Sequence, residues 1–473
     1  MAMAIRSLLI FLCILSITVP TFSLYEDQAG LMDWHQKYIG KVKHAVFQTQ
    51  KTGRKRVLVS TEENVIASLD LRHGEIFWRH VLGTNDAIDG IDIAMGKYLI
   101  TLSSEGSILR AWNLPDGQMW WESFLQGPSD SKSFLFVSTS TKVDKDNTIL
   151  VFGKGSLHAI SSMHGEIVWK VDFPAESFEV QEVIQHHDSN TVYVVGFVGF
   201  SQFDVYQINA KNGELLKHDS AAFDGGFSGE VSLVSKAKLV VLDAARSTLL
   251  TISFQNGEIS FQKTYVSDLV KDFSGMAVIL PSKLTGLFAV KTNTATTFIS
   301  VSSEGQLEVI DKINHATVIS DALSFSEDRQ AFALVQHGDN DIHLNVKQGH
   351  DWNSDLLKER IKLNQQRGFV HKVFMNNYVR TDKSHGFRAL IVMEDHSLLL
   401  LQQGEIVWSR EDGLASIIGV TTSELPVEKK GVSVAKVEQN LLNGLKYDLI
   451  ISQKFNWLTE DEYCQKSLFQ GLK

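Results

Sequence analysis

Cysteine is scarce in this chain, which excludes a fold held together by disulfide bonds. The 473 residues contain two cysteines, Cys13 and Cys464. Cys13 lies in an N-terminal segment that we expect to be removed, so the mature chain would keep one thiol and could form no internal disulfide. The stability of the fold must then come from the packing of apolar side chains.

Long hydrophobic runs are also missing, apart from one near the N-terminus. That run, residues 8–19, precedes the small residues Thr21 and Ser23. It is too short to cross a bilayer comfortably, and its pattern is typical of a cleaved secretory signal. We therefore expect residues 1–23 to be a signal peptide. The longest later run, residues 192–200, is shorter still, so the sequence predicts no membrane-spanning helix in this chain.

An excess of basic residues is absent as well. The chain carries 45 Lys and Arg against 55 Asp and Glu, a formal net charge of −10, which argues against nucleic acid as the main partner. The most basic run, residues 51–56, is predicted to be a charged hairpin tip, with contact to anionic lipid or an acidic partner as the alternative. No Asn-x-Ser/Thr sequon occurs, which neither supports nor excludes a lumenal location.

The motifs that usually carry catalysis are absent too. The chain has no Gly-x-Gly-x-x-Gly, Gly-x-Ser-x-Gly or Cys-x-x-Cys motif, and residues 225–229 have the wrong glycine spacing for a phosphate site. The cluster at residues 186–188 suggests a metal, but adjacent side chains on a strand point to opposite faces. We expect both segments to be loops, and we expect no catalytic residue, metal or cofactor, although the members of a triad need not be close in sequence.

What the chain does contain is one motif that returns with changes. In the first full copy, Asp70 ends an apolar run, Gly74 supplies the positive φ of a tight turn, and Trp78 follows in the next strand. The later copies are Asn113 with Gly117 and Trp121, Ser161 with Gly165 and Trp169, Asn209 with Gly213, Ser253 with Gly257, Asp311 with His315, Asn345 with Gly349, and Gly404 with Trp408. From residue 74 to residue 404 the mean spacing is about 47 residues, the length of a four-stranded propeller blade.

These patterns predict an all-β fold, a β-propeller of four-stranded blades with about eight repeats and seven as the alternative. The segments between the turns alternate with period two or are short β-branched runs, as in residues 56–60, 191–195 and 238–242. The tryptophans are expected to pack between blades and not to form a binding cage. These are Trp34, Trp78, Trp121, Trp169 and Trp408.

The two ends of the propeller are less regular. Gly30 and Trp34 have the spacing of Gly74 and Trp78, so we expect a strand over residues 30–40 that completes a blade built from the far end of the chain. Because Gly404 to Trp408 supplies a fourth strand of its own, the partner of that N-terminal strand is expected beyond residue 473. The sequence therefore leaves the closure of the ring open.

The expected domains are a signal peptide at 1–23, a propeller over 24–425, and an amphipathic helix with a divergent tail over 426–473. Residues 355–363 are predicted to be a short helix or an irregular strand. The apolar face of the C-terminal helix makes it a candidate for contact with a membrane surface. This face contains Val434, Val437, Leu441 and Leu445.

The motif of Asp70, Gly74 and Trp78 resembles the tryptophan-docking repeat of pyrroloquinoline-quinone propellers. Catalytic members of that group use a bound quinone, calcium and, in several, adjacent cysteines. The mature chain has one cysteine, so it cannot supply the adjacent pair, and it has no evident carboxylate cluster to hold calcium. The resemblance therefore supports the fold and not the enzymatic activity. A soluble quinoprotein oxidoreductase is the alternative function, and a lumenal sensor that dimerises through the propeller edge is a third hypothesis.

A more specific resemblance runs from residue 24 to about residue 446. The segments that carry it, at 24–43, 64–67, 74–81, 387–390 and 407–411, are similar to the family of subunit 1 of the ER membrane protein complex. The resemblance implies a non-enzymatic lumenal scaffold, associated with the ER membrane, in a machine that inserts weakly hydrophobic or tail-anchored helices without ATP. It implies the other subunits as partners, with client membrane proteins contacted indirectly.

The resemblance ends before the chain does. Members of that family are about twice as long and finish with a transmembrane helix, whereas residues 447–473 do not match their continuation. We therefore expect this chain to be a truncated form, in contact with the membrane only peripherally.

Overall fold

The computed structural model describes most of the chain between residues 38 and 412, and two short strands after it. The described residues are 38–48, 54–128, 134–137, 148–174, 178–186, 191–199, 201–222, 226–235, 237–255, 258–270, 273, 277–280, 286–302, 304–314, 320–325, 331–337, 341–348, 357–362, 369–380, 385–403, 405–412, 420–424 and 447–451. Gly30, Trp34 and the predicted helix over Val434 to Leu445 lie outside these residues.

Thirty-two consecutive strands form eight four-stranded antiparallel sheets, which we call blades 1 to 8. Blades 1 to 4 contain β1 (Val42–Gln48), β2 (Arg56–Thr61), β3 (Val65–Asp70), β4 (Ile76–Val81), β5 (Ile88–Ala94), β6 (Tyr98–Ser103), β7 (Ile108–Asn113), β8 (Met119–Phe124), β9 (Phe134–Val137), β10 (Thr148–Gly153), β11 (Ser156–Ser161), β12 (Ile167–Asp172), β13 (Phe178–His186), β14 (Thr191–Val198), β15 (Gln202–Asn209) and β16 (Leu215–Ala222).

Blades 5 to 8 continue in the same way. They contain β17 (Phe227–Ser235), β18 (Lys238–Asp243), β19 (Thr248–Gln255), β20 (Glu258–Tyr265), β21 (Val278–Leu280), β22 (Leu287–Lys291), β23 (Ala295–Val301), β24 (Leu307–Asn314), β25 (Ser320–Phe325), β26 (Ala331–His337), β27 (Asp341–Gln348), β28 (Leu357–Lys362), β29 (Val370–Val379), β30 (His385–Met393), β31 (Leu398–Gln402) and β32 (Glu405–Arg410). A single helical turn, α2 (Val266–Leu269), lies between blades 5 and 6, and β33 (Val420–Glu424) pairs with β34 (Tyr447–Ile451).

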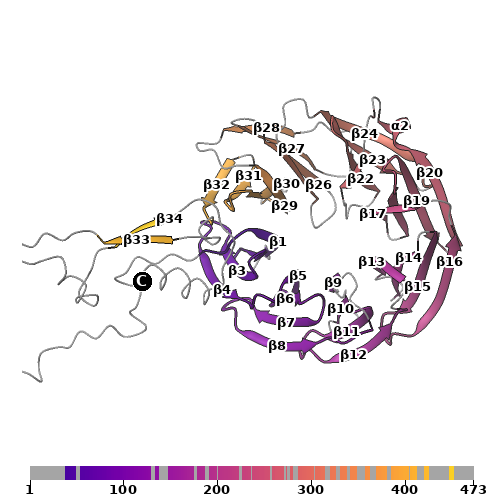
Figure 1. Ribbon diagram of the computed structural model, residues 1–473, viewed down its shortest axis with the longest axis horizontal. Coiled ribbons are helices and arrows are strands. Elements are labelled where there is room, and N and C mark those ends of the chain that lie inside the picture. The colour runs from indigo at the N-terminus through magenta and orange to yellow at the C-terminus, as the bar shows by residue number, and fades with distance from the viewer. Residues whose placement is uncertain are drawn as a thin grey trace, which may run out of the picture. The chain divides into compact units, whose positions relative to one another are not determined.

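The blades are arranged in a ring, which confirms the predicted β-propeller with eight repeats (Figure 1). The first strand of each blade faces the centre, and the fourth, which we call the outer strand, lies at the circumference. Side chains between neighbouring blades form the core. One cluster, for example, joins Leu102 and Ala111 of blade 2 to Val151 and Ile160 of blade 3. The inner strands are therefore covered on both faces, which explains their continuous β-branched runs.

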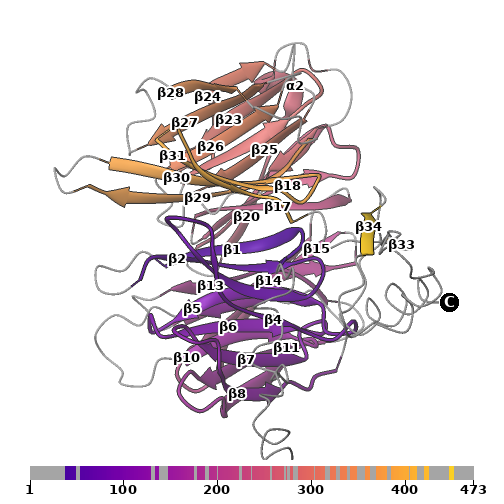
Figure 2. The ribbon, with the colours of Figure 1, turned by 90° about the vertical axis from the view of Figure 1, so that its left-hand side faces the viewer.

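The ring closes within this chain, a point that the sequence left open. Blade 8 is built from its own four strands, β29 to β32, and blade 1 from β1 to β4. One apolar cluster contains Val57 and Leu69 of blade 1 together with Leu390 and Leu400 of blade 8. Figure 2 views the ring from the side where these two blades meet. Residues 38–40, within the expected N-terminal strand, are not in a strand, and β1 begins at Val42.

The sixth repeat was placed wrongly by the sequence pattern. Asp311 lies inside β24, the fourth strand of blade 6, and not at the end of the third strand, where Asp70 lies in blade 1. The turn between β23 and β24 contains Gly305, with φ of 91°. Gly305 stands 48 residues after Gly257 and 44 before Gly349, in place of the 58 and 34 that His315 gave. The error arose because Gly305 has neither signal of the repeat: Val301 stands where the other copies have a small polar residue, and Val309 stands where several have the tryptophan.

Two further predictions are corrected. Residues 357–362 are neither a helix nor irregular, because β28 pairs with β27 without a register shift. Residues 227–229 are not a loop, because β17 begins at Phe227. Among the described residues, no helix has both the length and the apolar character needed to cross a membrane.

Candidate functional site

The repeated glycine and tryptophan meet at the interface between blades. Gly117 has φ of 75°, and a Cβ atom at this position would lie 2.6 Å from the Trp78 ring of the preceding blade. The Trp78 indole N–H donates a hydrogen bond to the Leu114 carbonyl in the same turn, at 2.8 Å. Glycine is needed here for two reasons, since it alone tolerates the positive φ freely and lets the indole ring approach the backbone.

The same contact is made at four consecutive interfaces. Each indole N–H donates to the carbonyl that follows the small polar residue of the next turn. Besides Trp78 with Gly117 and Leu114, the contacts join Trp121 to Gly165 and Ser162, Trp169 to Gly213 and Ala210, and Trp408 to Gly74 and Leu71. The last of these joins blade 8 to blade 1 across 337 positions of the chain.

The small polar residue closes the turn that receives the indole. The backbone carbonyl of Asp70 accepts a hydrogen bond from the Gly74 N–H at 2.9 Å. The Asp70 carboxylate accepts a second one from the Arg72 N–H at 2.7 Å. Asn209 makes the equivalent side-chain contact to the Lys211 N–H at 2.9 Å. These are the Asx-type contacts that favour Asp and Asn in turns.

The other four interfaces have no tryptophan at this position. Lys217, Phe261 and Val309 occupy it in blades 4, 5 and 6. At the interface of blades 5 and 6, the Lys238 ammonium donates instead to the Ser302 carbonyl at 3.0 Å. Arg56 makes a contact like that of Lys238, because its guanidinium donates to the Leu114 carbonyl of blade 2. The sequence had placed Arg56 in a charged hairpin tip.

Five of the eight outer strands carry a β-bulge directly before the tryptophan or, in blade 4, before Lys217 at the same position. In blade 2, Met119 pairs with Trp112 and Trp121 pairs with Ala111, which leaves Trp120 as the extra residue. The bulge lets Trp121 point into the interface while Trp120 stays 59% exposed. The extra residues of the other blades with this geometry are Phe77, Val168, Leu216 and Val407.

The sequence reading missed this exposed apolar group. Its signal is a pair of large apolar residues directly before the tryptophan or, in blade 4, before Lys217, where strict alternation would place one polar residue in the pair. The pairs in blades 2, 3, 4 and 8 are at least 40% exposed. They are Met119 and Trp120, Ile167 and Val168, Leu215 and Leu216, and Ile406 and Val407.

The interface of blades 8 and 1 also has a group of charges. The Lys41 ammonium lies 3.3 Å from a Glu394 carboxylate oxygen, and His371 contacts Glu394 at 3.4 Å and Glu62 at 3.7 Å. Burial, together with the positive charge of Lys41, lowers the pKa of His371. The buried Asp412 carboxylate accepts the Ile39 N–H at 3.0 Å. Charged side chains thus contribute to the contact between the first and the last blade of the ring.

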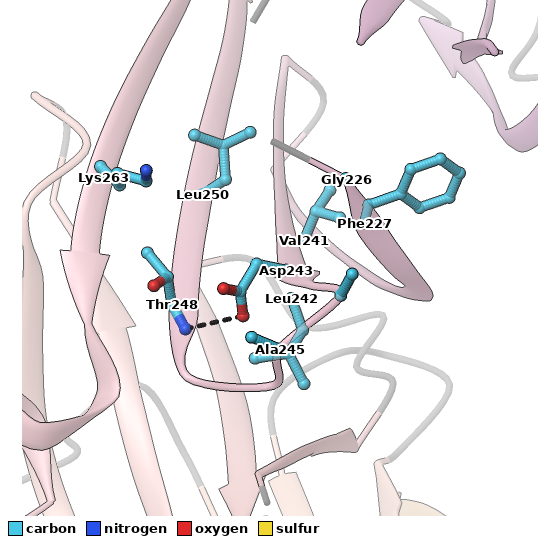
Figure 3. A pocket seen from close by; sticks show the side chains of 10 residues that line it. Gly226, Phe227, Val241, Leu242, Asp243, Ala245, Thr248, Leu250 and Lys263 are labelled. Carbon is cyan, nitrogen blue, oxygen red and sulfur yellow. Dashed lines mark hydrogen bonds between the residues drawn. The ribbon is translucent and has the colours of Figure 1, made fainter. Parts of the chain in front are cut away.

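A small cavity lies in blade 5 (Figure 3). Its volume is about 210 Å³, and it is bordered by Phe227, Val241, Leu250 and the aliphatic part of Lys263. The Asp243 carboxylate at its end accepts the backbone N–H of Thr248 at 2.8 Å. This volume is below that of drug-sized ligand pockets. Among the described residues, no three His, Cys, Asp or Glu side chains are placed to hold a metal ion.

The chain matches the family model of the EMC1 N-terminal beta-propeller domain over residues 23–412. ER membrane protein complex subunit 1 of Gallus gallus is 28% identical over 450 residues, which cover 86% of this chain and 45% of that protein. The Xenopus laevis protein of the same name is 25% identical over 465 residues, covering 88% and 46%. The chain spans about half the length of these relatives.

Solved structures resemble the ring only loosely. BamB from Moraxella catarrhalis, for example, is 12% identical with a TM-score of 0.44, and the match covers 77% of this chain and all of that one. A likeness of this degree carries no functional argument.

Proposed function

Because this chain belongs to the family of the EMC1 N-terminal β-propeller, we propose that it acts as a lumenal scaffold subunit of the ER membrane protein complex. The family match over residues 23–412 carries the proposal, since it includes all eight blades. The tryptophan contacts support it in physical terms. They join neighbouring blades through side chains, and the described outer strands form the ends of their sheets, where partner proteins can pair with them.

In this role the chain supports the energy-independent insertion of transmembrane helices, including tail-anchored and weakly hydrophobic ones. Its direct partners are the other subunits of the complex, and client proteins are contacted indirectly. The chain itself performs no catalysis. Contact with the membrane is peripheral, and the apolar residues Val434, Val437, Leu441 and Leu445 are the proposed element for it.

Co-purification tests the scaffold role. The full chain, carrying an affinity tag, is expressed in cells that lack the endogenous relative, and microsomes are solubilised in mild detergent. We expect the other subunits to be recovered with it, and tail-anchored clients to return toward their normal abundance. A chain that enters the ER and is recovered alone would contradict the scaffold role.

A spectroscopic assay separates the scaffold from the quinoprotein alternative. The purified chain is incubated with pyrroloquinoline quinone and calcium, and dye reduction is followed with alcohol and sugar substrates. We expect no turnover above that of the free quinone. Calcium-dependent dye reduction by the chain would favour the oxidoreductase.

A further inference from the structure

Among the described strands, β20, the outer strand of blade 5, has an unusually regular outer edge. All eight of its residues pair in sequence with β19, from Thr248 opposite Tyr265 to Gln255 opposite Glu258, without a register shift. Six of the other seven outer strands are interrupted by a shift. The remaining one, β28, is two residues shorter and has four charged residues in six.

Bulges and charged residues are the usual means by which a protein prevents another strand from pairing with an exposed sheet edge. β20 contains no bulge and no proline, and it carries two charged residues in eight, Glu258 and Lys263. It also forms the end of its sheet. Of the eight outer strands, β20 therefore has the edge with the fewest features that prevent pairing with a further strand.

The side chains of β20 define what that strand must carry. Ile259 and Phe261 pack against the core shared by blades 4 and 5. Lys263 and Tyr265 follow on the same face because the side-chain period of a strand is two. Lys263 is exposed, and Tyr265 is 56% exposed. The face therefore presents an aromatic residue, a cation and a second aromatic residue at alternate positions.

We propose that β20 receives an extended segment of a partner protein as a fifth, antiparallel strand of blade 5. The segment carries a carboxylate opposite Lys263 and apolar residues opposite Phe261 and Tyr265. Main-chain hydrogen bonds supply affinity in this mode of binding, and alternate side chains supply specificity. Opposite charges facing each other across two strands stabilise the pair, whereas like charges destabilise it.

A second copy of β20 does not meet these requirements. Its face that contains Lys263 also contains Ile259, Phe261 and Tyr265, and none of these supplies a carboxylate. Charge complementarity with Lys263 therefore favours an acidic and apolar segment of another protein over a second β20. This inference does not rest on the scaffold role, since it follows from the edge of one blade.

Two peptides test the proposal with the full chain. The first is acetyl-Tyr-Thr-Glu-Thr-Val-Thr-Thr-amide, and the second has Lys in place of Glu. Calorimetric titration is expected to show that Lys263→Glu weakens the first peptide by about fivefold or more and strengthens the second by a similar factor. The matched control is Lys312→Glu, because Lys312 has the equivalent position on β24, which is bulged. It is expected to change neither affinity.

Hydrogen exchange locates the bound peptide. We expect slower amide exchange over residues 258–265 when the first peptide is present. Because Lys263 is exposed, the Lys263→Glu variant should keep the unfolding midpoint of the unchanged chain, which excludes misfolding as the cause. The proposal is overturned if neither peptide binds at millimolar concentration, if the Lys263→Glu and unchanged chains do not differ, or if protection appears on another outer strand.

Discussion

At the scale of single residues, the contact between a glycine and an indole decides how each blade meets the next. Gly117 and Gly83 lie in the same region of the ring and differ in what surrounds them. Gly117 has a positive φ and the Trp78 ring against it, whereas a Cβ atom at Gly83 would meet nothing within 4 Å. One glycine is therefore required by the fold, and the other is not.

We expect Gly117→Ala to lower the free energy of unfolding by about 2–4 kcal/mol, because it combines backbone strain with overpacking. The control, Gly83→Ala, is expected to change it by less than about 1 kcal/mol. Urea unfolding followed by tryptophan fluorescence measures both. Equal midpoints for the two variants would show that the indole can move away at little cost.

Buried His158 makes the stability depend on pH. Its side chain is fully buried on β11, and burial lowers its pKa below the ordinary value of 6.5. The unfolded chain then binds a proton more readily than the folded one, so stability is full above pH 6.5 and decreases as the pH falls below it. We expect His158→Phe to reduce the loss of stability between pH 6.5 and pH 5.

Urea midpoints measured across this range provide the comparison. The unchanged chain, measured under the same conditions, is the reference. If His158→Phe leaves the slope of stability against pH as it was, the dependence arises elsewhere in the ring.

At the scale of the element, the bulged outer strand gives two adjacent residues opposite roles. Trp121 is 8% exposed and lies between blades, whereas Trp120 is 59% exposed. Since the bulge turns only one of them inward, the two substitutions to alanine should differ strongly even though the residues are neighbours.

We expect Trp121→Ala to cost about 3–5 kcal/mol of stability, as for other buried aromatic residues. Trp120→Ala should cost less than about 1 kcal/mol, for the loss of its hydrogen bond to the Met163 carbonyl. Chemical unfolding of the two variants under the same conditions tests the difference. Similar losses would mean that Trp120 is part of the core.

The elements were largely predictable from the sequence, because the turn of Asp70 and Gly74 and the β-branched runs are local signals. The position of the sixth repeat was not, since Gly305 has neither the small polar residue before it nor the tryptophan after it. The bulges were also missed, because they depend on the pairing of two strands and not on the residues of one. The regular edge of β20 could be recognised only after the other outer strands were seen to be irregular.

At the scale of the whole molecule, side chains close the ring, since the described strands of blades 1 and 8 each pair within their own blade. The contact of Trp408 with Gly74 joins blades 8 and 1 in the same way as the contact of Trp121 with Gly165 joins blades 2 and 3. The difference is that Trp408 joins segments that are 337 positions apart, and closing so long a segment carries a larger entropy cost.

We expect Trp408→Ala to loosen blades 1 and 8 before the rest of the ring unfolds, so that amide exchange rises first over β1 to β4 and β29 to β32. Trp121→Ala should raise exchange in blades 2 and 3 while the closing interface stays protected. Hydrogen exchange with mass spectrometry distinguishes the two patterns. Uniform exchange across all blades in both variants would show that the ring unfolds as one unit.

The tryptophan contacts lie at four neighbouring interfaces, from blades 8 and 1 round to blades 3 and 4. We expect the circle to be stiffer along this arc than along the arc of blades 4 to 7. When heat or a pulling force is applied, the blades of that second arc should separate first. The blades joined by the tryptophan contacts would then remain together.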